Sequence, residues 1–302
     1  MRIVSLLPSL TELVAALGHA DDLVGVTHEC DFPPGVDRLP HLTRSRIPPD
    51  ATSAAIDARV AQSGGSLYEL DGALLAELRP DLVLTQTQCD VCAVNEDAVR
   101  RVASGLPGTP RVESVNPTDL AGVHAVFRRV GDLVDAREAA EALITAFEAT
   151  AAEIASRRRG RPDRRVLVLE WLDPPFSSGH WNPEIIRLAG GSETIGRAGE
   201  RSRRLSWDEV ASARPEVLLL SPCGFTLERT DAEWSELARA PGWRDLPAVR
   251  NGEVVMVDGS AYFSRPGPRL EASLRIAAAA IDPEACADLA PHSGWRRVAV
   301  TD

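Results

Sequence analysis

One short pattern occurs twice in this chain and constrains its fold more than any other feature. Residues 77–85 and residues 212–221 both read as the end of an amphipathic helix, then Arg-Pro, an acidic residue and a continuous apolar run. Proline disfavours helical geometry at the residue before it and lacks a backbone donor, so each helix should end there. A continuous apolar run is typical of a parallel strand that is buried on both faces. The repeat therefore predicts two similar α/β lobes, and the cleft between them is where we expect function.

The length of the chain, 302 residues, suits two lobes that each bury a core. A helical stretch at 136–158 interrupts the strand pattern; at 1.5 Å per residue it spans about 35 Å, enough to run from one lobe to the other. We predict two Rossmann-like lobes with parallel-rich sheets, joined by one long α-helix. The predicted boundaries are an N-terminal lobe at 1–116, a helical linker at 117–160, a C-terminal lobe at 161–282 and a peripheral tail at 283–302.

The charge of the chain excludes several classes of protein. The net charge is −11, with acidic residues spread along the length, which argues against a nucleic-acid partner because phosphates require a basic face. All 33 basic residues are arginine. The chain therefore has neither the lysine of a Schiff-base enzyme nor the lysine of a phosphate-binding P-loop.

The first residues and the cysteines predict a compartment. Only five apolar residues precede Pro8, fewer than the core of a secretory leader, and no segment is apolar for long enough to insert into a membrane. The five cysteines are an odd number and form a poor disulfide framework. We therefore expect a cytoplasmic monomer, with a periplasmic or extracellular location as the alternative if translation starts elsewhere.

Three helix boundaries follow from local signals. Ser9 with Glu12 three residues later predicts a capping box at the start of the first helix, and Ser206 with Glu209 predicts another in the second lobe. Residues 68–79 are predicted as one helix, ending at the first Arg-Pro.

Aromatic residues gather in the loops that follow the predicted strands. Aromatics make up only 5% of the chain, so their concentration at the carboxyl ends of the strands, where α/β proteins bind ligands, is informative. Aromatic walls suit a large, flat, partly apolar ligand. The candidate ligand-binding residues are Trp171, Phe176, Trp181, Phe225, Tyr262, Phe263, Arg265 and Gln88.

Five short segments, in this order and spacing, resemble one known family. They are residues 3–13, 78–83, 174–179, 190–195 and 262–269. Together they are similar to the ABC-transporter substrate-binding proteins that capture vitamin B12 and iron chelates, with the vitamin B12-binding branch nearest. The resemblance implies two α/β lobes joined by one long helix, and a cobalamin or other corrinoid as the ligand.

The resemblance also implies roles for particular residues. Phe176 and Tyr262 fall where the family has ligand-stacking aromatics. Family members carry one acidic residue near each Arg-Pro helix that docks on a membrane permease; Asp208 occupies that place in the second lobe and Ala73 in the first. Members also begin with a secretion or lipoprotein signal, and this chain starts at the first strand of the family's mature form.

Four soft or borderline metal ligands lie in two loops of the first lobe, namely His28, Cys30, Cys89 and Cys92. Cys-x-x-Cys with His-x-Cys has the ligand number of a tetrahedral zinc site. The same residues suit a redox-active thiol pair or an axial ligand to the metal of a corrinoid or haem. The alternative is structural: buried cysteines and a hydrogen-bonded histidine.

Three functions follow from these features. The first is a protein that binds a corrinoid or related metal-tetrapyrrole chelate in the inter-lobe cleft, for storage, sensing or transfer to an acceptor enzyme. The second is a Cys/His metal- or thiol-dependent enzyme on the same scaffold. The third is the substrate-binding component of a vitamin B12 or iron-chelate ABC transporter, with a permease as partner.

Overall fold

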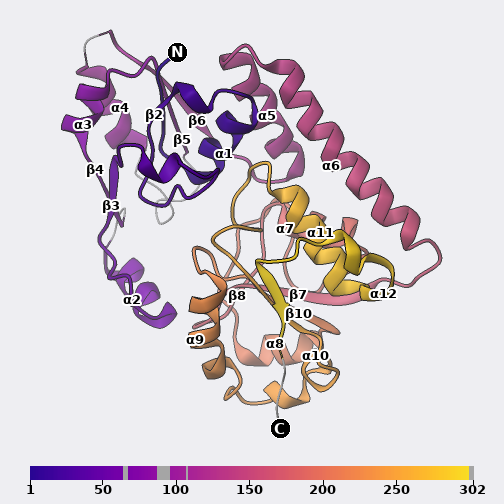
Figure 1. Cartoon of the computed structure of the whole chain (residues 1–302). Helices are drawn as coiled ribbons and strands as arrows, with labels where there is room; N and C mark the ends of the chain where they lie inside the picture. Colours follow the sequence, from indigo (N-terminus) through magenta and orange to yellow (C-terminus); the bar gives the residue numbers. More distant parts are fainter. Residues whose placement is uncertain (64–66, 87–95, 107, 299–302) are drawn as a thin grey trace. The chain divides into compact units, whose positions relative to one another are not determined.

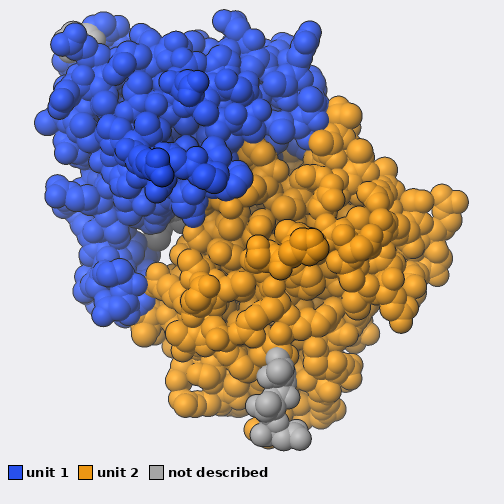
Figure 2. All heavy atoms as spheres, viewed as in Figure 1, with its two compact units in different colours: residues 1–51, 55–117, 121–144 blue, residues 52–54, 118–120, 145–302 orange. Residues whose placement is uncertain are grey.

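The computed structural model describes residues 1–63, 67–86, 96–106 and 108–298. The chain separates into two compact units, coloured in Figure 2. Unit 1 comprises residues 1–51, 55–117 and 121–144, and unit 2 comprises residues 52–54, 118–120 and 145–302. The long helix α6 (Arg137–Arg157) carries the chain from unit 1 to unit 2, as the sequence predicted (Figure 1). Within the described residues, every helix is too short or too polar to cross a bilayer.

Unit 1 is built on a parallel sheet with the strand order β2-β1-β5-β6. Its strands are β1 (Ile3–Ser5), β2 (Leu23–Gly25), β5 (Leu82–Gln86) and β6 (Arg111–Val115). A separate antiparallel pair joins β3 (Thr43–Ser45) to β4 (Tyr68–Leu70). The helices are α1 (Pro8–Ala16), α2 (Ser53–Ser63), α3 (Gly72–Leu78), α4 (Glu96–Ser104) and α5 (Leu120–Leu133). Every residue of β5 is buried, as expected of a central strand covered on both faces.

Unit 2 has a larger sheet with the order β12-β11-β10-β7-β8, in which β9 also pairs with β7. The strands β7, β9, β10 and β11 are parallel, whereas β8 and β12 are antiparallel to their neighbours. Their bounds are β7 (Arg164–Trp171), β8 (Phe176–Ser177), β9 (Gly191–Glu193), β10 (Val217–Leu220), β11 (Val254–Val257) and β12 (Trp295–Arg297). The helices are α7 (Asn182–Leu188), α8 (Trp207–Ala213), α9 (Leu227–Leu237), α10 (Pro247–Arg250), α11 (Leu270–Ile281) and α12 (Pro283–Cys286).

The repeated Arg-Pro pattern ends a helix and leads into a buried strand in both units. Helix α3 ends at Arg79 (φ 43°) before β5, and α8 ends at Arg214 (φ 47°) before β10. The left-handed conformation turns the chain sharply, and the proline that follows prevents the helix from continuing. The prediction of two similar α/β units is confirmed.

Two local predictions were wrong. Residues 68–70 form strand β4, and α3 begins only at Gly72, because the Asp71 carboxylate accepts a hydrogen bond from the backbone N–H of Leu74 and caps the helix there. Ser9 lies inside α1, whose N-cap is Leu7, because Pro8 takes the first helical position. The capping box of Ser206 and Glu209 is confirmed.

The C-terminal residues take part in the sheet of unit 2. Trp295, Arg296 and Arg297 pair with β11 in antiparallel register, opposite Val257, Met256 and Val255. Within the segment predicted as a peripheral tail, residues 283–297 therefore supply the short helix α12 and an edge strand. A strand of three residues bounded by loop lacks the length that makes a strand readable from sequence.

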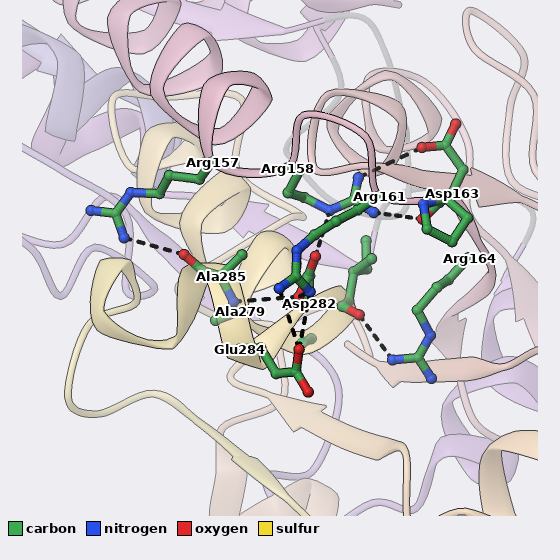
Figure 3. A network of polar contacts seen from close by, with 12 residues as sticks. Arg157, Arg158, Arg161, Asp163, Arg164, Ala279, Asp282, Glu284 and Ala285 are labelled. Atoms are coloured by element: carbon green, nitrogen blue, oxygen red, sulfur yellow. Dashed lines mark hydrogen bonds and ion pairs between the residues drawn. The ribbon is translucent and has the colours of Figure 1, made fainter.

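An arginine–carboxylate network fastens the end of α6 to the start of α12 (Figure 3). Arg158 Nε lies 3.2 Å from Asp282 Oδ2, with only 6% and 8% of the two side chains exposed. Arg161 Nη1 approaches Asp282 Oδ1 at 2.9 Å, and Asp163 Oδ1 lies 3.6 Å from Arg158 Nη1 with 67% of its side chain exposed. Removing one partner from a buried ion pair leaves the other charge buried without a counterion, which destabilises the fold.

Two carboxylates of unit 2, Glu170 in β7 and Glu193 in β9, hydrogen-bond to the segment 178–182. Glu170 Oε1 accepts from the Asn182 Nδ2 at 2.6 Å and from the Gly179 N–H at 3.2 Å. Glu193 Oε2 accepts from the Ser178 hydroxyl at 3.1 Å. Desolvation raises the pKa of each carboxyl group to about 7, against the opposing effect of these hydrogen bonds. Neither has an ion pair within the described residues.

The buried network generates a stability prediction. We expect Asp282→Asn to lower the free energy of unfolding by about 3 kcal/mol, because Arg158 keeps its charge and loses its buried counterion. Asparagine still caps α12, so the cap is preserved. Asp163→Asn is the matched control on the same arginine, and its exposed pair should contribute about 1 kcal/mol or less. Urea unfolding measures both variants, and equal losses would contradict the assignment of the buried pair.

The raised carboxyl pKa values generate a pH prediction. A carboxyl group whose pKa is raised in the native state stabilises the fold below its unfolded pKa, and this contribution is lost as the pH rises to about 7. Glu170→Gln keeps an oxygen for the same donors and does not titrate. Relative to wild type, we expect the variant to gain up to about 3 kcal/mol between pH 4.5 and 7.5. Unfolding curves across this range measure the gain, with exposed Glu236→Gln as control; a difference that does not change with pH would refute the shift.

Candidate functional site

The loops that carry the predicted aromatic residues follow the carboxyl ends of the parallel strands of unit 2. Trp171 is the last residue of β7, Phe225 lies beyond the end of β10, and Tyr262 lies beyond the end of β11. These strands are neighbours in the sheet, so their carboxyl ends meet at one edge.

Trp171 and Phe225 form an aromatic pair at this edge. Their ring centroids are 5.1 Å apart in an edge-to-face arrangement. Phe225 is 1% exposed, and the Arg229 guanidinium carbon lies 3.7 Å from its ring centroid. Trp171 is partly exposed. Trp171 is therefore the member of this pair with ring surface to offer a ligand, and Phe225 supports it from behind.

Trp181 and Phe263 are buried and fix the loop between β11 and α11. Trp181 Nε1 donates to the Phe263 carbonyl at 2.7 Å, and the Phe263 N–H donates to Ser273 Oγ at 3.0 Å. Phe263 is fully buried and has a φ of 64°, a conformation that these hydrogen bonds hold in place. Both rings act within unit 2 as packing and positioning groups.

Phe176 and Tyr262 are partly exposed, and each ring has an arginine nearby. The guanidinium carbon of Arg204 lies 6.0 Å from the Phe176 centroid, and that of Arg269 lies 5.8 Å from the Tyr262 centroid. Arg265 is 9% exposed and donates to Ser260 Oγ at 3.2 Å, so it stabilises the loop that carries Tyr262. With Trp171, these two rings are the predicted ligand-binding aromatics that keep exposed surface.

In unit 1, His28 is oriented by hydrogen bonding. Its Nδ1 lies 2.7 Å from Thr43 Oγ1, and its ring centroid lies 5.4 Å from that of Tyr68. Burial lowers the pKa of His28, and the charge of His41 acts in the same direction. The imidazole is therefore neutral at pH 7, and its Nε2 has no hydrogen-bond partner among the described residues. A neutral imidazole fixed through one nitrogen is the arrangement that metal-binding histidines use.

The other predicted metal ligands differ in what the structure says of them. Cys30 is 3% exposed, and its Sγ lies 3.2 Å from the hydroxyl oxygens of both Thr11 and Thr27. Cys89 and Cys92, together with the predicted ligand-binding residue Gln88, lie outside the described residues. In the part of the chain that is described, no three His, Cys, Asp or Glu side chains form a cluster suited to a metal ion. The zinc site stays a prediction.

Phe32 is a candidate that sequence reasoning missed. It follows the loop of His28 and is 41% exposed, and the only other exposed large hydrophobic residue among those described is Met1. Single exposed hydrophobic residues are common on protein surfaces, so its place close to His28 in the chain is what makes Phe32 a candidate. The signal was present in the sequence, since Phe32 lies in a loop that follows a strand of the first lobe.

Comparisons with known proteins agree with this architecture. Residues 3–261 match the model of the periplasmic binding protein family. A vitamin B12-binding protein from Yersinia pestis is 22% identical over 277 residues, covering 89% of this chain and 82% of the relative.

Solved structures share the fold. A periplasmic heme-binding protein from Pseudomonas aeruginosa aligns with a TM-score of 0.72 at 20% identity, covering 94% of this chain and 93% of that protein. The periplasmic vitamin B12-binding protein BtuF of Vibrio cholerae aligns with a TM-score of 0.66 at 18% identity, covering 93% and 96%. Because the family model matches most of the chain and the two-unit fold agrees with it, this chain belongs to the periplasmic binding protein family.

Proposed function

We propose that this protein binds a metal-tetrapyrrole chelate, a corrinoid or a haem. The observation that carries the proposal is the set of partly exposed rings of Trp171 at the end of β7, Phe176 in β8 and Tyr262 in the loop after β11, at the carboxyl edge of the unit 2 sheet. Large flat ligands with apolar faces stack on such rings. The relatives support the same class, since their names describe vitamin B12-binding and heme-binding proteins.

His28 of unit 1 is the proposed ligand to the chelated metal. Its Nδ1 is engaged by Thr43, which leaves Nε2 as the nitrogen that approaches a metal. A corrinoid or haem metal accepts an imidazole in an axial position, and this ligation changes the visible spectrum.

The relatives favour a binding protein over the Cys/His enzyme alternative. Their names describe binding proteins, and one from Listeria monocytogenes is described as an ABC transporter substrate-binding protein. We infer the same role here: the protein delivers its chelate to a membrane permease, in the periplasm or outside the cell, in place of the expected cytoplasmic location.

Asp208 is the acidic residue of unit 2 that we assign to permease docking. It is exposed at the first turn of α8 and has no ion pair among the described residues. Its neighbour Glu209 is already engaged, through the capping box with Ser206 and an ion pair of 2.8 Å with Arg203. The free carboxylate is therefore the one available to a basic partner.

The ligand proposal is tested by visible-absorption titration of the reduced protein with hydroxocobalamin and with haemin. We expect saturable binding of at least one of them, weakened about tenfold by Phe176→Ala or Tyr262→Ala, because each loses one stacking ring. Trp234→Leu removes a partly buried ring of α9 outside these loops and should leave the affinity unchanged. Absence of saturable binding to both compounds would overturn the proposal.

The same titration separates the role of His28 from binding itself. His28→Gln should abolish the spectral shift that accompanies binding and leave the aromatic contribution to affinity in place. A shift that persists in this variant would remove His28 from the metal and leave the binding proposal intact. Cyanocobalamin, whose upper axial position is blocked by cyanide, serves as the ligand control.

A further inference from the structure

Unit 2 contains a cavity of about 380 Å³ whose lining includes none of the ligand-binding residues proposed above. It lies between strand β8, the segment that follows β9, and helix α8. Its lining includes Ser177, Ser178, Arg197, Arg201, Arg203 and Ser212. The volume falls within the range that small organic ligands occupy.

None of the proposed ligand-binding aromatic residues lines this cavity, although Ser177 directly follows Phe176 in β8. The aromatic loops follow the carboxyl ends of β7, β10 and β11. The cavity is lined instead by the C-terminal half of α8, at Ser212 and Ala213, which immediately precedes the turn into the amino end of β10. Thr194, another lining residue, donates its backbone N–H to the carbonyl of Val166 near the amino end of β7.

The backbone that carries the three arginines is held along segment 177–180. The N–H of Ser177 donates to the Arg203 carbonyl at 2.9 Å, and the N–H of His180 donates to the Glu200 carbonyl at 2.7 Å. The two segments approach so closely that a Cβ at Gly179 would lie 2.4 Å from the backbone nitrogen of Ser202. The backbone that carries the arginines is therefore held in place, which reduces the conformational entropy that is lost when a ligand binds.

The opposite wall is fixed by Glu193. One of its carboxylate oxygens accepts from the N–H groups of Ile195 at 3.2 Å and Gly196 at 3.3 Å, and the other accepts from the Ser178 hydroxyl at 3.1 Å. A Cβ at Gly196 would lie 2.3 Å from Ser178 Oγ. The Glu193 carboxylate therefore positions three residues that line the cavity, namely Ser178, Ile195 and Gly196.

The cavity is lined by more arginines than glutamates. Three arginines and two glutamates line it, and Arg203 is paired with Glu209 at 2.8 Å. Arg201 lies near enough to His180 to lower the pKa of that imidazole, in addition to the larger effect of burial. Arg197 is exposed, and its side chain has neither a hydrogen bond nor an ion pair among the residues that the structure describes.

We propose that this cavity binds a small organic or inorganic oxyanion, a phosphate or a carboxylate. A guanidinium presents five N–H donors in a planar fork that matches both groups, and the hydroxyls of Ser177 and Ser212 add neutral donors beside it, whereas that of Ser178 donates to Glu193. In this arrangement Arg197 is the primary contact, because Arg203 is already committed to Glu209. The site is independent of the chelate, so its occupation does not require the proposed function.

The test is isothermal titration calorimetry with inorganic phosphate and with citrate, at constant ionic strength. We expect saturable one-site binding in the millimolar range or tighter for at least one anion, and preference between the two identifies the phosphate or the carboxylate class. Arg197→Gln should weaken binding about tenfold or more, through the loss of charge-assisted hydrogen bonds. The variant should fold normally, since Arg197 is exposed and unpaired among the described residues.

Arg250→Gln is the matched control. Arg250 is also an exposed arginine of unit 2, it pairs with Asp245 at 2.7 Å, and it does not line the cavity. Its substitution should leave the affinity unchanged. Equal weakening by both variants would show that the anion only screens surface charge, and the absence of saturable binding to both anions would overturn the site. Either result leaves the chelate titration unaffected.

Discussion

The burial of parallel strands on both faces determines where everything else in this protein lies. All four residues of β10 are fully buried, and so are those of β11 beside it. The strands β10 and β11 are apolar along their whole length, so the groups that could bind a ligand lie at the strand ends and in the loops beyond them. Trp171 at the end of β7 and Tyr262 beyond β11 lie where the chain leaves the covered part of the sheet.

Arginine serves three different purposes in a chain without lysine. Buried Arg158 stabilises the junction of α6 and α12 through its pair with Asp282. Arg79 and Arg214 end helices in left-handed geometry ahead of a proline. Arg197 is exposed on a rigid frame and has no partner among the described residues. The first two purposes are structural and the third suits an anionic ligand, so the surroundings of each guanidinium decide its function, whereas its residue type does not.

The features that the sequence predicted are those that local chemistry determines. The Arg-Pro repeat, the buried strands and the long helix α6 each depend on a period or on a backbone restriction that neighbouring residues reveal. Strands β4 and β12 could not be predicted, since each has three residues and depends on a partner distant in the chain. The aromatic residues show the same division. The sequence predicted that Trp181 and Phe263 follow strands of the second lobe, but only the fold shows that they are buried.

The proposed function places a metal-tetrapyrrole chelate at the loops on the carboxyl edge of unit 2. Hydrogen exchange followed by mass spectrometry, with and without saturating hydroxocobalamin or haemin, tests this most directly, because it reports which backbone segments a ligand orders. We expect slower exchange in peptides that cover 172–181 and 258–268, and unchanged exchange in 283–297. Protection confined to other segments, with these two loops unaffected at saturation, would contradict it.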